Sequence, residues 1–100
     1  PPVNPKVNIT APDLFADVTE TVKIVGTASG DDFAYYRVQV GKGLNPQEWI
    51  QLGGDVTNPV ESGVLAEWDT KGLSGLYAVQ LVVVREGQLV DTAVIQVTIK

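Results

Sequence analysis

The sequence predicts an all-β fold, a sandwich of seven short antiparallel strands. Three observations support this prediction. Segments in which polar and apolar residues alternate recur along the chain, and Gly, Pro, Asn and Asp separate them. No window of eleven or more residues has the i, i+3, i+4, i+7 spacing of an amphipathic helix. Residues 68–84 form a glycine-marked corner that leads into a long apolar strand, as is typical of small sandwiches.

Each predicted strand has one apolar and one polar face, because side chains alternate along an extended chain. The strands are expected at residues 6–10, 21–28, 34–40, 49–52, 64–68, 76–84 and 90–99. The third strand directs Tyr36, Val38 and Val40 inward and Tyr35, Arg37 and Gln39 outward. The last strand places five side chains on one face, namely Asp91, Ala93, Ile95, Val97 and Ile99.

The connections follow from turn chemistry. Gly87, at a turn position that needs a positive φ, predicts a hairpin between the last two strands. Asn45 and Pro46 allow at most one helical turn before the fourth strand, and residues 57–63 are expected to be irregular.

A structural corner is predicted around Trp68, Asp69, Gly75 and Tyr77. The Asp69 side chain is expected to bond to the backbone of the turn, and glycine lets the chain bend sharply. Tyr77 starts the next strand with its ring inward and its hydroxyl near the rim. This arrangement is similar to the tyrosine corner of Greek-key sandwiches.

Composition narrows the classes of function. A net charge of −5 argues against a nucleic-acid binder and against docking on an anionic membrane. With no His and no Cys, neither a Ser–His–acid triad nor a thiolate metal site can form. We therefore expect no catalytic residue, no metal and no cofactor. No segment approaches the roughly 18 apolar residues of a membrane-spanning helix.

The chain is expected to be one domain, residues 6–100, preceded by the end of a linker at residues 1–5. Closely spaced prolines at the start favour an extended chain. Because the sequence contains no Met, we expect it to be a piece of a longer protein.

The residues alone offer two candidate binding sites. Tyr35, Arg37 and Trp49 could contact a glycan ring or a partner protein, although an outward Tyr also simply suits a strand. Asp31, Asp32 and Asp55 could converge on Ca²⁺ at one end of the sandwich, but the chain lacks a D-x-D-x-D-G loop.

Three motifs carry a family resemblance. Residues 33–49 read F-x-x-Y-R-x-x-x-G-x-G-x-x-P-x-x-W, residues 63–77 read G-x-L-A-x-W-D-T…G-x-Y, and residues 24–28 read I-x-G-T-A. The chain resembles immunoglobulin-like domains of exported bacterial proteins. In particular it is similar to the C-terminal accessory modules of class A penicillin-binding proteins, which are peptidoglycan glycosyltransferase–transpeptidases. Similar modules follow subtilisin-like proteases and other surface proteins.

The resemblance implies a seven-stranded immunoglobulin- or fibronectin-III-like sandwich outside the cytoplasm, acting as a non-catalytic spacer or docking domain. The expected partners are neighbouring domains of the parent chain, and peptidoglycan or a wall-associated protein. It assigns core or corner roles to Tyr36, Trp49, Trp68 and Tyr77, and turn roles to Gly26, Gly41, Gly43 and Gly75. The alternatives are a carbohydrate- or peptidoglycan-binding module that uses Tyr35, Arg37 and Trp49, a spacer of a secreted protease or surface protein, and an autonomous hydrolase.

Overall fold

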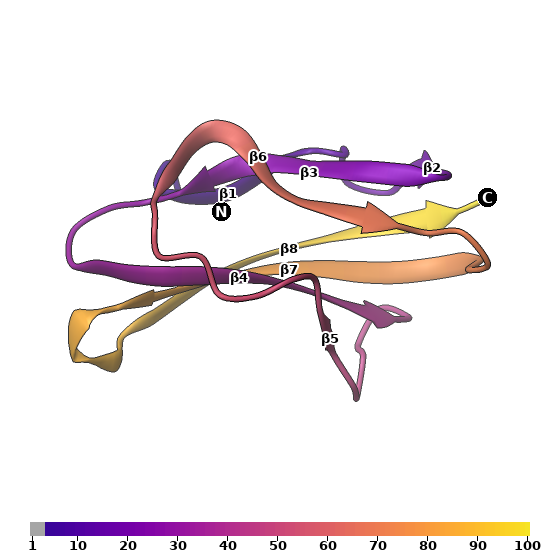
Figure 1. Cartoon of the computed structure of the whole chain (residues 1–100). Coiled ribbons are helices and arrows are strands. Elements are labelled where there is room, and N and C mark those ends of the chain that lie inside the picture. Colours follow the sequence, from indigo (N-terminus) through magenta and orange to yellow (C-terminus); the bar gives the residue numbers. More distant parts are fainter. Residues whose placement is uncertain (1–3) are drawn as a thin grey trace.

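The fold consists of two β-sheets that face each other, as the computed structural model of residues 4–100 shows (Figure 1). One sheet has three strands in the order β1-β3-β6, and the other has five in the order β2-β8-β7-β4-β5. The strands are β1 (Val7–Ala11), β2 (Ala16–Val18), β3 (Thr21–Ala28), β4 (Phe33–Lys42), β5 (Ile50–Gln51), β6 (Val60–Asp69), β7 (Gly75–Arg85) and β8 (Val90–Ile99). The predicted all-β fold is confirmed.

The long strands pair within each sheet, either with a neighbour in sequence or with a strand distant in sequence. β7 and β8 form an antiparallel hairpin from Gly75↔Ile99 to Val84↔Val90. Their turn is a short 3-10 segment, Glu86–Gln88, in which Gly87 has a φ of +83°. The predicted hairpin and its glycine are therefore confirmed.

The core lies between the two sheets and consists of the inward residues of each strand. The most completely buried apolar side chains include Ile24, Val38, Val79, Leu81, Val83 and Val97. The inward face predicted for the last strand is confirmed, since Ile95, Val97 and Ile99 are buried. Burial of alternate residues follows from the period-2 geometry of a strand, and it sets which side chains remain available outside.

One buried hydrogen bond joins the two sheets. The Tyr36 hydroxyl on β4 donates to the Leu65 carbonyl on β6, at 2.9 Å. Leu65 is the extra residue of a bulge, because Ile24 pairs with Ala66 while Val25 pairs with Val64. The bulge interrupts the β3–β6 ladder, and the tyrosine hydroxyl provides its carbonyl with a partner.

The strand count differs from the prediction. Residues 4–100 contain eight strands rather than seven, because residues 16–18 pair in parallel with β8. A three-residue segment is too short to show periodicity, so only its pairing reveals it. β6 begins at Val60, inside the segment expected to be irregular, and no helical turn forms at residues 45–48.

Two of the four glycines assigned to turns lie inside strands. Gly26 is in β3, where a Cβ would overlap the Asn8 carbonyl oxygen of β1. Gly41 is in β4, where a Cβ would overlap Pro46 and approach the Glu48 carbonyl oxygen to 2.7 Å. The turn roles predicted for Gly26 and Gly41 are therefore wrong, and both positions instead permit a close approach of two chain segments.

The corner between β6 and β7 brings two aromatic rings together. Trp68 is 3% exposed, and its ring meets that of Tyr77 edge-on with centroids 5.6 Å apart. The Asp69 carboxylate accepts a hydrogen bond from the Lys71 N–H at 2.9 Å, and Gly75 has a φ of +94°. In a tyrosine corner the hydroxyl bonds to the backbone, but in the described chain no hydrogen bond involves the Tyr77 hydroxyl. The tyrosine that bonds to the backbone of the facing sheet is Tyr36.

The two ends of the described chain lie at opposite ends of the sandwich. Near the start, the Lys6 carbonyl accepts a hydrogen bond from the Ser29 N–H, beside the β3–β4 connection. At the other end the Lys100 N–H donates to the Val18 carbonyl, and Ile99 pairs with Gly75. The molecule measures 38 × 24 × 23 Å. Of the predicted linker at residues 1–5, the first three residues lie outside those described. Within residues 4–100 no helix is long and apolar enough to cross a membrane.

Candidate functional site

Tyr35 and Arg37 lie together on the outer face of the five-stranded sheet. Both belong to β4, two residues apart, and therefore point to the same side. The Arg37 guanidinium donates to the Tyr35 hydroxyl at 3.2 Å, and its central carbon lies 5.4 Å from the Tyr35 ring centroid. This is a cation–π distance, and the guanidinium covers part of the ring that a sugar would otherwise contact.

The charge of Arg37 is already paired. Its Nε lies 3.2 Å from a carboxylate oxygen of Asp55, in the connection that follows β5. Gln51 of β5 donates to the same carboxylate at 2.9 Å. The side chains of Arg37 and Asp55 are 30% and 43% exposed, so solvent screens the pair. Arg37 is thus held in a surface network and does not offer a free cation.

Trp49 does not join this pair. It precedes β5 and is partly exposed. Because Gln51 pairs with Gln39, Trp49 lies near the level of Gly41, four residues beyond Arg37, or about 13 Å along β4. No ring contact or hydrogen bond between Trp49 and the other two residues occurs in residues 4–100. The predicted trio thus separates into a close pair and a distant tryptophan.

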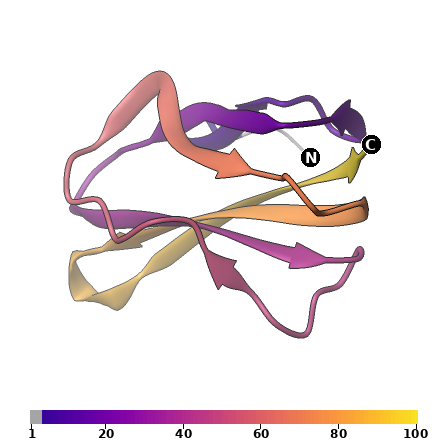
Figure 2. The same ribbon diagram turned by 45° about the vertical axis from the view of Figure 1, so that its right-hand side comes forward.

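A shallow pocket of about 290 Å³ opens on the other face of the same sheet, at the end of β4. The segment from β4 through β5 bends away from the three-stranded sheet in both views (Figures 1 and 2). Ile50 pairs with the buried Val40 but is 68% exposed, because no strand of the other sheet covers it.

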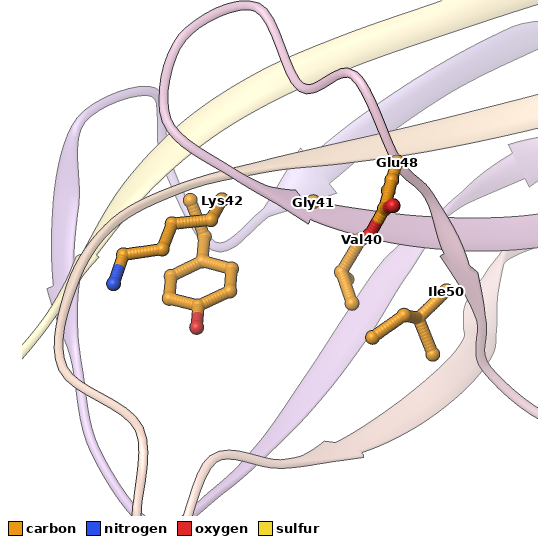
Figure 3. Close-up of a pocket in the computed structure, with 6 residues that line it drawn as sticks. Val40, Gly41, Lys42, Glu48 and Ile50 are labelled. Atoms are coloured by element: carbon orange, nitrogen blue, oxygen red, sulfur yellow. The ribbon is translucent and has the colours of Figure 1, made fainter.

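Lys42 lies on one side of this pocket, and Val40, Ile50 and Glu48 lie on the other (Figure 3). Its lining residues are Val40, Gly41, Lys42, Glu48, Ile50 and Tyr77. The pocket is at the lower limit of the volumes usual for small-molecule sites. It offers an apolar surface with one ammonium and one carboxylate. The sequence gives no signal for it, because it depends on how far the two sheets overlap.

The three acidic residues of the candidate calcium site do not lie together. Asp31 and Asp32 lie between β3 and β4, whereas Asp55 is bound to Arg37 and Gln51 beyond β5. Across residues 4–100, no three acidic side chains lie close enough to hold a metal ion.

One tyrosine has a perturbed acidity. Burial raises the pKa of the Tyr36 hydroxyl above its ordinary value of 10.0, because desolvation disfavours the phenolate. This hydroxyl is the one that donates to the Leu65 carbonyl, so the group belongs to the inter-sheet packing.

Comparisons of this chain with protein-family models, with curated proteins and with solved structures found no match.

Proposed function

We propose that this chain is an immunoglobulin-like accessory domain that acts as a non-catalytic spacer in an exported bacterial protein. The proposed parent is a class A penicillin-binding protein, on the strength of the three sequence motifs at residues 24–28, 33–49 and 63–77. The domain would set the distance between its neighbouring domains and the cell wall or a wall-associated partner.

The strand order supports an immunoglobulin-like type of sandwich. The N-terminal part of the chain contributes β1 to the three-stranded sheet and then β2 to the edge of the five-stranded sheet. Immunoglobulin-type folds pack two antiparallel sheets face to face around a buried Trp on the third strand, strand C. Here the buried Trp68 lies on β6 instead, so it supports only the face-to-face packing.

The observation that carries the spacer proposal is the position of the chain ends. The chain enters beside Ser29 and leaves beside Gly75, at opposite ends of a body 38 Å long. A domain with this geometry, placed between two others, separates them by about its own length. The ladders β3–β6, β4–β7 and β7–β8 make the body stiff along this axis.

The proposal is tested by replacement in the full-length parent. Exchange of residues 6–100 for an unrelated sandwich of equal length should preserve the parent's activity, whereas deletion should impair it. A spacer needs only its length, so loss of activity in the exchanged protein would refute the spacer function.

The parent is tested by the coding sequence that flanks residue 1. An S-x-x-K box followed by S-x-N and K-T-G would identify a transpeptidase. A protease domain or an array of similar sandwiches would instead support a spacer of a secreted protease or surface protein.

The competing binding function rests on the pair Tyr35 and Arg37 and on Trp49. Sedimentation of the isolated domain with purified sacculi separates the two functions. Retention at low salt that is lost on Tyr35→Ala would favour a glycan-binding module. A spacer predicts no retention, since the Arg37 charge is paired and part of the Tyr35 ring is covered.

A further inference from the structure

We infer that the free edge of β8 pairs with the same edge of a second copy of this chain, so that two five-stranded sheets join into one. The inference rests on the edge itself and is independent of the proposed function. The outer edge of β8 is only partly paired, since β2 pairs with β8 at Val97, Thr98 and Ile99 alone. Nothing in residues 4–100 pairs with residues 90–94 on the side away from β7.

The direction of the backbone groups along this edge follows from one hydrogen bond. The Phe15 N–H donates to the Gln96 carbonyl, so the backbone groups of Gln96 face the side of β2. Alternate residues of a strand face the same side. Val90, Thr92 and Val94 therefore present their N–H and C=O groups to the open side, ready for another strand.

The side chains of the same residues are exposed and apolar or uncharged. Val90 and Val94 are 54% and 42% exposed on the outer face of the sheet, with Thr92 between them. The single ionisable side chain in residues 90–96 is Asp91, and its carboxylate accepts a hydrogen bond from Arg85 Nε at 2.8 Å. No free charge, proline or bulge protects this stretch, which are the usual defences of an edge strand.

The outermost strands of the two sheets carry such defences or are very short. β6 has two register shifts and the carboxylates of Glu61, Glu67 and Asp69. β1 contains a register shift, and β5 and β2 are only two and three residues long. Compared with these four strands, residues 90–94 form an edge without such a defence.

The sequence of this edge complements itself. Residues 90–94 read V-D-T-A-V, with valines placed symmetrically about Thr92. In an antiparallel pairing centred on Thr92, each Thr92 faces the other, and each Val90 faces a Val94 of the second copy. Thr–Thr and aliphatic cross-strand pairs are favourable, and no like charges are opposed. The contact is a two-fold one in which both copies use the same surface.

Further exposed apolar side chains lie where this pairing ends. In the same register Leu89 of one copy comes level with Ile95 of the other, next to Phe15, which is bonded to Gln96. Leu14, Phe15 and Leu89 are 57%, 60% and 69% exposed. The pairing would therefore bring exposed apolar side chains of the two copies beside each other, among them Phe15, Leu89, Val90 and Val94.

The dimer should be weak and should respond to salt. Short-edge contacts belong to the class below about 1,200 Å² of buried surface. Each copy has a net charge of −5, so added salt should strengthen association by screening the repulsion between copies. Sedimentation velocity from about 10 µM to about 1 mM covers the relevant range of dissociation constants.

Charge substitutions test the register. In V90K/V94K two ammonium groups face each other at both outer positions, and dimerisation should weaken about tenfold. In V90E/V94K each carboxylate faces an ammonium, and dimerisation should persist. Two added lysines change the net charge from −5 to −3, which by itself would favour association, so weakening in V90K/V94K would report the local contact. V64K is the control for a lysine placed away from this edge, since Val64 is 47% exposed on β6.

A single cysteine provides a second test if a charge variant folds poorly. The chain has no Cys, so T92C introduces one thiol that lies opposite itself. A hydrogen-bonded pair separates its Cα atoms by about 5.5 Å, within the range of a disulfide. T92C should therefore oxidise to a covalent dimer, and V64C should not. A native chain that stays monomeric at about 1 mM, or a dimer that V90K/V94K does not weaken or V64K weakens equally, would overturn the inference.

Discussion

Removal of a single oxygen atom, in Tyr36→Phe, tests the account of how the two sheets are joined. The Tyr36 hydroxyl donates to the Leu65 carbonyl at 2.9 Å, and Tyr36 is 3% exposed. Phe keeps the ring packing but leaves the carbonyl without this partner. An unsatisfied buried acceptor costs about 1–3 kcal/mol, so the free energy of unfolding should fall by that amount.

Thermal and urea unfolding measure this loss. For a domain of this size about 1 kcal/mol lowers Tm by about 4 °C, so the expected decrease is about 4–12 °C. Tyr35→Phe is the matched control: the Tyr35 hydroxyl is partly exposed and accepts only from Arg37, and its removal should cost less than about 0.5 kcal/mol. If Tyr36→Phe costs no more than Tyr35→Phe, water or another group satisfies the Leu65 carbonyl, and the Tyr36 hydroxyl does not stabilise the contact between the sheets.

Three further predictions concern Tyr36, Gly26 and Arg85. Burial raises the pKa of Tyr36 in the folded state above the unfolded value of 10.0. The contribution of Tyr36 to the free energy of unfolding is therefore fully present below pH 10.0 and is lost as the pH rises through the folded pKa. Alkaline unfolding of Tyr36→Phe should lack this part of the decrease. Gly26→Ala should lower the free energy of unfolding by about 1–3 kcal/mol, because its Cβ meets the Asn8 carbonyl, and Gly54→Ala, in open space, should be nearly neutral by urea unfolding. Arg85→Ala removes hydrogen bonds to the Asp91 carboxylate (2.8 Å) and the Asp31 carbonyl (2.9 Å), made by a side chain that is 13% exposed. We expect thermal unfolding to show a loss of about 1–3 kcal/mol in the free energy of unfolding. Arg37→Ala should cost less, because the ion pair of Arg37 is more exposed to solvent, and an equal loss would contradict this expectation.

Local patterns predicted most of the strands because they record a direct physical constraint. In β4, alternation separated the buried Tyr36 and Val38 from the outward Tyr35 and Arg37, since a strand between core and solvent must alternate. Gly87 indicated the hairpin because few other residues adopt its positive φ readily. The candidate site was predicted less well. Tyr35 and Arg37 share a strand face and are found in contact, whereas the place of Trp49 depends on the loop before β5.

What the sequence by itself determined is the all-β class, the inward face of each long strand and the absence of His and Cys chemistry, because these depend on residue type and on spacing within one segment. The tertiary structure alone decided which strands meet. It paired β2 with β8, left residues 90–94 unpaired on the side away from β7, brought Tyr36 to Leu65 and bound Asp55 to Arg37. It also turned Gly26 and Gly41 from apparent turn residues into points of close packing. These contacts join residues far apart in the chain, and no local pattern records which distant segment will supply the partner.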